Sequence, residues 1–129
     1  MAQDFHKLAV WERSVELTVW GYRMTHSFPR EEVYGLTSQM RRASVFVASN
    51  IAEGRGRLSI AEFRQFLGMA QGSLFELRTQ LEVAKRLERT RPDRIHRCQS
   101  LCEEVSKMLA SFIETLRKDQ QTHGLKAES

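Results

Sequence analysis

Residues 35–56 read GLTSQMRRASVFVASNIAEGRG and predict an amphipathic helix. Apolar side chains recur along it every three or four residues, at Leu36, Met40, Ala43, Val47 and Ile51. At about 100° per residue these positions form one stripe of a helix. Gly54 is expected to end the helix in the left-handed conformation, which glycine adopts without a Cβ clash. An apolar stripe of this length needs neighbouring helices to cover it.

The rest of the chain supplies those neighbours. Apolar residues that recur every three or four positions predict helices over about 5–26, 60–89 and 93–118, besides the helix at 34–53. Four helices with short connections fold most simply as an all-α, up-down-up-down four-helix bundle. The bundle is expected to occupy residues 1–118. The polar stretch 119–129 lacks the apolar period and is expected to be a disordered tail.

The start of the third helix is the clearest local signal in the sequence. Ser59 and Glu62 are spaced for a capping box, in which Ser59 caps the Glu62 amide. Leu58 and Phe63 are spaced for a hydrophobic staple across the same turn. We therefore expect the helix to begin directly after Ser59.

Composition limits the class of protein. The chain has 129 residues, of which 41% are hydrophobic and 28% are charged, so it suits one globular domain. Its formal net charge of +4 permits a nucleic-acid partner without requiring one. No apolar run approaches about 20 residues and no signal pattern opens the chain, so we expect a cytoplasmic protein without a membrane partner.

Motifs that carry catalytic chemistry are not found in the sequence. It contains no nucleophile elbow, phosphate-binding loop or zinc motif. His96, Cys98 and Cys102 form the best metal candidate, but the two cysteines lie on the apolar seam of the fourth helix. A thiol there behaves as a small hydrophobic group, which favours core packing. We expect no enzyme, no catalytic residue, no metal and no cofactor.

A row of basic residues follows one flank of the helix at 60–89. Arg64, Gln71, Arg78 and Lys85 repeat every seven residues, and Arg89 continues the line. If the helices abut suitably, the patch extends to Arg41, Arg42, Arg55 and Arg57. Such a surface can follow a phosphate backbone. The alternative is a solvated flank, because Glu82 can pair with its basic neighbours.

Two features suggest contacts between subunits. The helix at 5–26 is apolar on two sides, with Leu8, Trp11, Val15, Val19 and Tyr22 on one and Val10, Leu17, Trp20, Gly21 and Met24 on the other. We assign the first side to the bundle core and the second to an oligomer interface, although scattered exposed apolar residues are also common. Gly68 and Gly72 lie opposite the core seam of their helix, where a second helix could approach closely, or they are tolerated surface glycines.

Four motifs together resemble a known family. They are FxxLxVW at residues 5–11, FPxxExYGLTSQMRRA at 28–43, NIAEG at 50–54 and GSLxELxTQL at 72–81. They are similar to the four-helix-bundle proteins encoded by intervening sequences in bacterial 23S ribosomal RNA genes. The resemblance covers residues 5–117 and implies a ring-like homo-oligomer, a homopentamer with a central opening. It also implies a relation to accessory proteins of diversity-generating retroelements, which bind nucleic acid through a basic surface.

The expected function follows from the basic flank and the resemblance together. We expect a non-enzymatic protein that assembles with itself and binds structured RNA or DNA through a basic oligomer surface. Repetition of a modest basic flank around a ring would multiply weak phosphate contacts. Two alternatives stay open, an oligomeric scaffold for an unidentified protein partner and an accessory subunit of an enzyme, neither with a nucleic-acid role.

Overall fold

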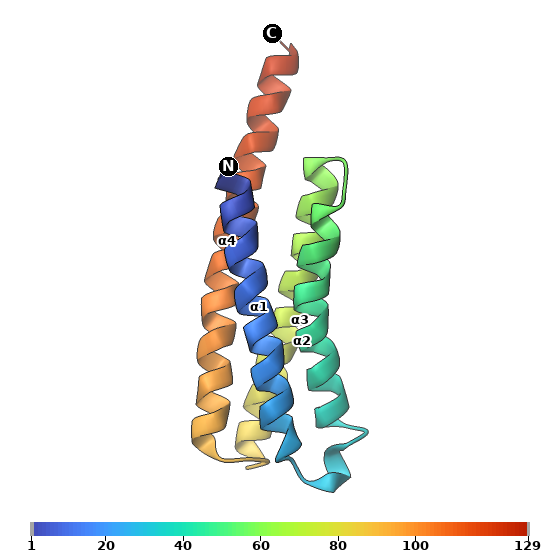
Figure 1. Ribbon diagram of the computed structural model, residues 1–129, viewed down its shortest axis with the longest axis vertical. Coiled ribbons are helices and arrows are strands. Elements are labelled where there is room, and N and C mark those ends of the chain that lie inside the picture. Colours follow the sequence, from blue (N-terminus) through green and yellow to red (C-terminus); the bar gives the residue numbers. More distant parts are fainter. Residues whose placement is uncertain (1, 129) are drawn as a thin grey trace.

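The computed structural model describes the backbone of residues 2–128 and the side chains of residues 9–122. Its helices are α1 (Ala2–His26), α2 (Leu36–Arg55), α3 (Ile60–Arg86) and α4 (Pro92–Glu128), with a short 3-10 helix η1 (Arg30–Glu32) before α2. Successive helices run in opposite directions, which confirms the predicted up-down-up-down bundle (Figure 1). Within the described backbone there is no strand.

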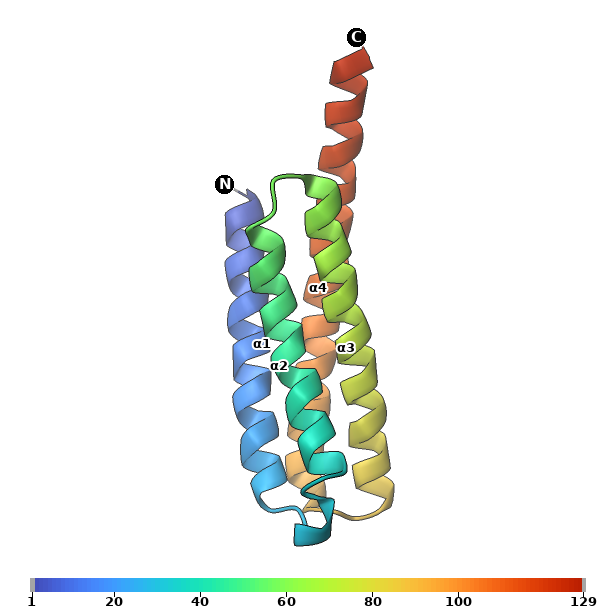
Figure 2. The same ribbon diagram turned by 90° about the vertical axis from the view of Figure 1, so that its right-hand side faces the viewer.

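The helices form a square in cross-section. α2 packs against α1 and α3, and α4 packs against α3 and α1, whereas the diagonal pairs do not approach closely in the described part of the chain (Figure 2). The α1–α2 and α3–α4 connections share the lower end of the bundle in Figure 1, and the α2–α3 loop lies at the upper end. The surface over α1 is therefore bounded by α2 and α4. None of the described helices combines the length and the apolar character needed to cross a membrane.

The predicted stripes of α2, α3 and α4 meet in one core. Met40, Val47 and Ile51 of α2 are at most 1% exposed. The rings of Phe63 and Phe112 meet edge to face, with 5.4 Å between centroids, where α3 contacts α4. The core of α4 includes both cysteines, as the sequence predicts; the fully buried side chains of that helix include Ile95, Cys98, Cys102, Val105, Leu109, Phe112 and Leu116.

The assignment of the two faces of α1 was wrong. Val10, Leu17 and Met24, predicted to form an oligomer interface, are at most 2% exposed and belong to the core. Of the residues predicted to face the core, Val19 and Tyr22 are each 42% exposed, whereas Trp11 is partly buried and does pack against the core. The side chain of Leu8 lies outside the described residues. Of the predicted interface residues on α1, only Trp20 is partly exposed, and it packs against the edge of the core.

Small and hydroxyl-bearing residues explain this reversal. Ser14, Gly21 and Thr25 share the buried side of α1, and the hydroxyls donate to carbonyls of their own helix, Ser14 to Val10 at 2.7 Å and Thr25 to Gly21 at 2.8 Å. Because these polar groups are satisfied locally, they can be buried at little cost. Thr18 also donates across the interface to the carbonyl of Ser44 at 2.9 Å, which indicates close packing of α1 on α2.

Gly54 differs from its predicted role. It is helical and buried, and the helix ends one residue later at Arg55, followed by the C-cap Gly56, whose φ is −75°. A Cβ on Gly54 would lie 2.8 Å from Cδ1 of Phe63 and 3.0 Å from Cβ of Phe66. The glycine is thus required for the close approach of α3 to α2 and not for a left-handed turn.

The remaining helix ends show what the sequence did and did not predict. Ser59 accepts a hydrogen bond from the Glu62 amide at 3.1 Å, which confirms the cap. Leu58 is fully exposed, so the predicted staple is not formed. α4 does not end at residue 118, because no proline or glycine interrupts residues 119–122 and the Thr122 hydroxyl bonds the Lys118 carbonyl at 3.0 Å. The tail predicted at 119–129 is helical in its backbone as far as Glu128, and its side chains beyond residue 122 lie outside the described residues.

Candidate nucleic-acid interface

The predicted basic row of α3 lies along its boundary with α4. Arg64 donates through Nη1 to Oε1 of Gln120 at 2.6 Å, while its buried Nε has no partner. Carboxylates accompany the row: Glu82 bonds Arg86 at 3.2 Å and accepts from Gln99 at 3.4 Å. The Arg117 hydrogen bond lowers the pKa of Glu114, with a smaller contribution from Arg64. Acidic and basic groups therefore alternate there, which weakens any net attraction for phosphate.

The predicted extensions of that row lie elsewhere. Arg41 contacts α1, on the opposite side of the bundle from the α3–α4 boundary. Arg55 and Arg57 stand at the upper end, where Arg57 pairs with Glu53 at 3.5 Å. Arg89 pairs with Glu31 at 3.2 Å at the lower end. The continuous patch proposed from the sequence is therefore not formed, because its members occupy opposite sides and ends of one subunit.

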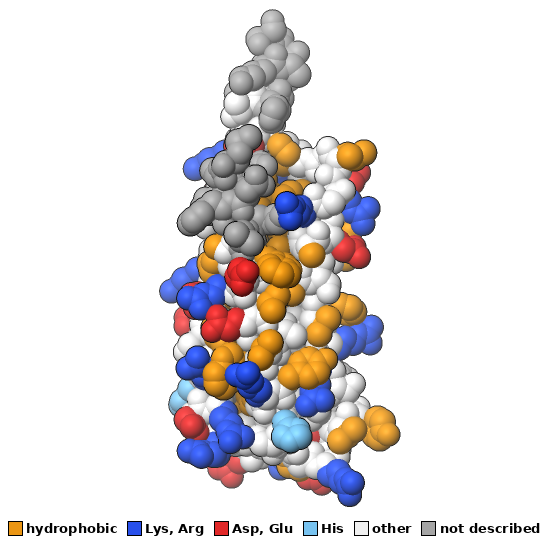
Figure 3. Space-filling view, viewed as in Figure 1, with side chains coloured by type: hydrophobic (Ala, Val, Ile, Leu, Met, Phe, Trp, Pro, Cys, Tyr) orange, Lys and Arg blue, Asp and Glu red, His pale blue; other side chains and the backbone are white. Residues whose placement is uncertain are grey.

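A different basic surface lies on the lower half of the bundle, centred on α1. We call it the arginine face and define it as Arg23 of α1, Arg30 of η1, Arg41 and Arg42 of α2, and Arg94 and Arg97 of α4. In Figure 3 the lower half of the molecule shows several basic side chains around a histidine. No carboxylate of a described residue lies within ion-pairing distance of these guanidinium groups.

Aromatic rings hold several of these arginines. Trp20 lies between Arg97, whose guanidinium carbon is 4.2 Å from the ring centroid, and Arg23, at 5.5 Å. Arg41 lies 4.6 Å from the ring centroid of Tyr22. A cation over an aromatic face is positioned without being neutralised, so its charge stays available to a ligand. Of this set the sequence analysis predicted only Arg41 and Arg42, because its members come from separate segments and show no period along one helix.

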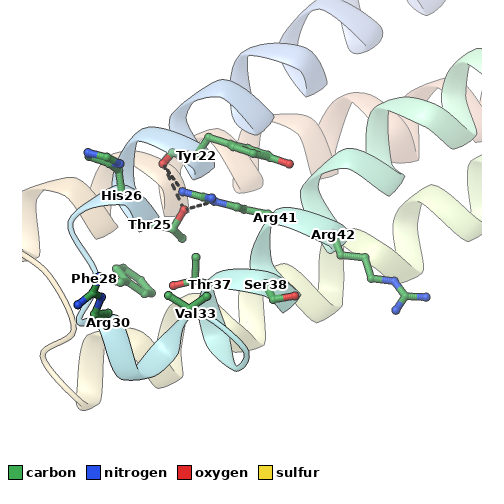
Figure 4. A pocket seen from close by; sticks show the side chains of 10 residues that line it. All are labelled: Tyr22, Thr25, His26, Phe28, Arg30, Val33, Thr37, Ser38, Arg41 and Arg42. Atoms are coloured by element: carbon green, nitrogen blue, oxygen red, sulfur yellow. Dashed lines mark hydrogen bonds between the residues drawn. The ribbon is translucent and has the colours of Figure 1, made fainter.

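The centre of the arginine face is hollowed. A cleft of about 650 Å³ lies between the end of α1, η1 and the start of α2 (Figure 4). In it Arg41 donates through Nε to the Thr25 hydroxyl at 2.9 Å and through Nη2 to the Tyr22 carbonyl at 3.4 Å. His26, at the end of α1, lines both this cleft and a second hollow of about 400 Å³ between α1 and α4, which Arg23 and Arg94 also line. The basic residues thus surround connected depressions.

The thiols do not add a nucleophile to this surface. Burial raises the pKa of Cys98 to about 11 and that of Cys102 to about 12, so both stay protonated near neutral pH. Among the described residues no group of three or more His, Cys, Asp or Glu side chains is placed to hold a metal ion.

Gly68 and Gly72 occupy the outer surface of α3. Both are exposed, and a Cβ built on either would meet nothing within 4 Å. Met69 and Phe75 beside them are about half exposed, at 52% and 53%. Single-chain packing therefore does not explain these glycines, and their role in an oligomer interface stays a prediction.

Comparison with known proteins identifies relatives of this fold. The family model described as 23S rRNA-intervening sequence protein matches residues 6–111. The structure is similar to the crystal structure of a protein with unknown function from the S23 ribosomal protein family of Bacteroides thetaiotaomicron VPI-5482, with a TM-score of 0.78. The two chains are 23% identical, and the match covers 84% of this chain and 98% of the other. That likeness shows the fold alone. No curated protein sequence matches the chain.

Proposed function

We propose that this chain, which belongs to the 23S rRNA-intervening sequence protein family, is a non-enzymatic cytoplasmic protein that binds structured RNA or DNA through its arginine face. The observation that carries the proposal is the set of guanidinium groups from α1, η1, α2 and α4 that no described carboxylate pairs with. Guanidinium groups bind phosphate oxygens bidentately, and aromatic contacts keep several of them in place.

Self-assembly is part of the proposal. The outer surface of α3 carries Gly68, Gly72, Met69 and Phe75 in an exposed stripe, on the opposite side of the bundle from α1. A homo-oligomer, in the form of a pentamer, that uses this stripe would leave the arginine face of each subunit free. Several copies of the face would then engage one nucleic acid, and avidity would exceed the affinity of a single subunit.

The exposed stripe also favours a second candidate, an oligomeric scaffold that presents α3 to a protein partner. Exposed apolar groups in one contiguous patch mark interaction surfaces more often than isolated ones do. In that case the arginine face would be a solvated surface, and the protein would have no nucleic-acid role.

Fluorescence anisotropy of a labelled stem-loop RNA and a DNA duplex, titrated with protein at several salt concentrations, separates these candidates. If about four phosphates are contacted, the logarithm of the duplex association constant should fall with the logarithm of salt concentration with a slope of about −3.6. The variant Arg23→Gln/Arg94→Gln/Arg97→Gln should weaken binding and flatten that slope.

The matched control removes the same charge from α3. The variant Arg78→Gln/Lys85→Gln/Arg86→Gln changes exposed residues and should leave affinity and slope close to those of the wild type. Equal losses in the two triple variants would contradict the proposed location of binding. Failure of the intact oligomer to bind at low salt would contradict nucleic-acid binding itself and favour the scaffold.

A further inference from the structure

We infer that the cleft between α1, η1 and α2 binds the terminal phosphate monoester of a nucleic-acid strand. We infer further that an adjoining hollow, lined by Tyr34, Gln39 and Phe46 and separate from the hollow between α1 and α4, receives the base of the same nucleotide. The inference rests on the proposed function and specifies its ligand as a phosphorylated strand end. The cleft is basic. Arg30, Arg41, Arg42 and His26 line it, and no carboxylate belongs to its lining.

Arg41 is preorganised for an anion. Hydrogen bonds from Nε and Nη2 to Thr25 and Tyr22 fix the plane of its guanidinium, and no hydrogen bond of Nη1 is formed within the described residues. The Tyr22 ring supports the guanidinium at 4.6 Å. Figure 4 shows Arg41 extending across the cleft while Arg42 points away from it. A ligand phosphate would thus meet a charge whose position is already set.

Hydroxyl groups add donors of the right kind. Thr37 lines the cleft and is 7% exposed, and no hydrogen bond of its hydroxyl is formed within the described residues. The hydroxyl is not one of the buried polar atoms that lack a partner, so solvent reaches it. The exposed Ser38 lines the cleft beside it. A phosphate oxygen in the cleft would replace water there and accept from these hydroxyls.

The number of donors favours a monoester over a diester. A terminal phosphate carries close to two negative charges and three free oxygens near neutral pH, whereas a backbone phosphodiester carries one charge and two free oxygens. The cleft offers the side chains of Arg30, Arg41 and His26 and the hydroxyls of Thr37 and Ser38, whereas Arg42 points away from it. The backbone amides of the first turn of α2 are not part of this site, because a carboxylate oxygen of Glu32 already lies 3.1 Å from the position that a Cβ on Gly35 would take.

The adjoining hollow is suited to a base. It has a volume of about 390 Å³ and shares Ser38 and Arg42 with the cleft, so the two are contiguous. Tyr34 lines it and is 96% exposed, which leaves aromatic surface for stacking. Phe46 also lines it and is 44% exposed, but the guanidinium of Arg42 already lies over its ring at 5.3 Å. Glu76 of α3 is the one carboxylate in the lining. Gln39 supplies an amide for a base edge. Phosphate-binding and aromatic subsites that share residues fit one terminal nucleotide.

The test compares strand ends. Single-stranded RNA oligonucleotides of one sequence are prepared with a 5′-phosphate, a 3′-phosphate or hydroxyls at both ends, and their anisotropy is titrated with the full-length protein. The wild type should bind one of the phosphorylated forms about tenfold more tightly than the hydroxyl form, as one or two charge-assisted hydrogen bonds would produce. The form that binds more tightly shows whether the site takes a 5′-phosphate or a 3′-phosphate.

Variants locate the effect in the cleft. Thr37→Val keeps the shape of the side chain and should reduce the phosphate preference several-fold, and Arg30→Gln should do the same. Tyr34→Ala should weaken binding of the phosphorylated and the hydroxyl-ended oligonucleotides alike, because a base loses its stacking partner. The control Arg97→Gln lies on the arginine face outside the cleft and should weaken all three oligonucleotides alike while the preference persists.

Two results would overturn the inference. Wild-type protein that binds the three oligonucleotides with equal affinity would refute a terminal-phosphate site while leaving the proposed function intact. A preference that survives Thr37→Val and Arg30→Gln unchanged would place the monoester elsewhere. Absence of binding to every RNA and DNA probe would instead refute the proposed function, and the inference with it.

Discussion

Substitution of Gly54 by alanine should destabilise the protein, although alanine is the better helix former. The new Cβ would lie 2.8 Å from Cδ1 and 3.2 Å from Cε1 of the Phe63 ring, and 3.0 Å from Cβ of Phe66. Neither neighbour can yield easily. The Phe63 ring is held edge to face against Phe112, and the Cβ of Phe66 moves only with the backbone of α3. Helices α2 and α3 must therefore separate slightly.

The magnitude follows from two opposing effects. Inserting a methyl group into a packed interface costs about 1–3 kcal/mol. The gain from replacing glycine inside a helix is at most about 1 kcal/mol, and it is smaller here because α2 ends one residue later, at Arg55. We expect the free energy of unfolding to fall by about 1–2 kcal/mol. For a domain of this size that loss lowers the melting temperature by roughly 4–8 °C.

Gly68→Ala provides the matched control. A Cβ at Gly68 meets nothing within 4 Å in the single subunit, so in the monomer this variant keeps the helix-propensity gain and adds no steric cost. At a protein concentration that dissociates the proposed oligomer, it should stabilise the monomer by about 1 kcal/mol. Urea unfolding followed by circular dichroism at one protein concentration measures both changes, since an oligomer has concentration-dependent stability. A Gly54→Ala variant as stable as the wild type would refute the steric explanation.

Two further predictions concern the end of α3 and the buried thiols. Glu88 has a φ of 53°, in the left-handed region that favours glycine. The Glu88 amide bonds the Lys85 carbonyl at 3.1 Å, and the Arg89 amide bonds the Ala84 carbonyl at 3.0 Å, as at a helix C-terminus. Glu88→Gly should therefore raise the free energy of unfolding by about 1 kcal/mol in urea titrations. Because burial raises both thiol pKa values in the folded state, to about 11 and about 12, the unfolded state ionises first as pH rises. Stability should therefore fall above about pH 8.5, by up to about 1.4 kcal/mol per pH unit for each thiol. Chemical unfolding between pH 7.5 and 9.5 measures this slope, and replacing both cysteines by alanine should remove it; an unchanged slope would show that other groups cause it.

The sequence predicted the bundle well where apolar residues alone define the buried face. The stripes of α2, α3 and α4 consist of aliphatic residues, the aromatic residues Phe63 and Phe112 and the small residues Ala43, Ala70, Cys98 and Cys102, and these are buried or packed against the core where expected. The cap at Ser59 was predictable because both partners lie within one turn. Gly54 was placed in the wrong role because a close approach between two helices cannot be read from one of them.

The basic surface was harder to predict for a different reason. Arg64, Arg78 and Lys85 form a visible period on one helix, but the carboxylates that accompany them come partly from α4. The arginine face has no such period, because Arg23, Arg41 and Arg97 come from separate helices. Only the order of helices around the bundle brings them together, and that order fixes α1 between α2 and α4.

The reversed face of α1 and the missed cleft have one physical cause. Thr25 is polar and is not among the apolar residues from which the faces of α1 were predicted, yet it is buried, and its hydroxyl donates to the Gly21 carbonyl at 2.8 Å. The same hydroxyl accepts from Nε of Arg41 at 2.9 Å. Burying this side of α1 against α2 therefore does two things at once: it hides a polar side chain, and it orients the guanidinium of Arg41 at the cleft. Thr25→Val should keep the core filled while releasing Arg41. Phosphate binding should then weaken more than stability does, and equal losses of both would show that Thr25 acts only in packing.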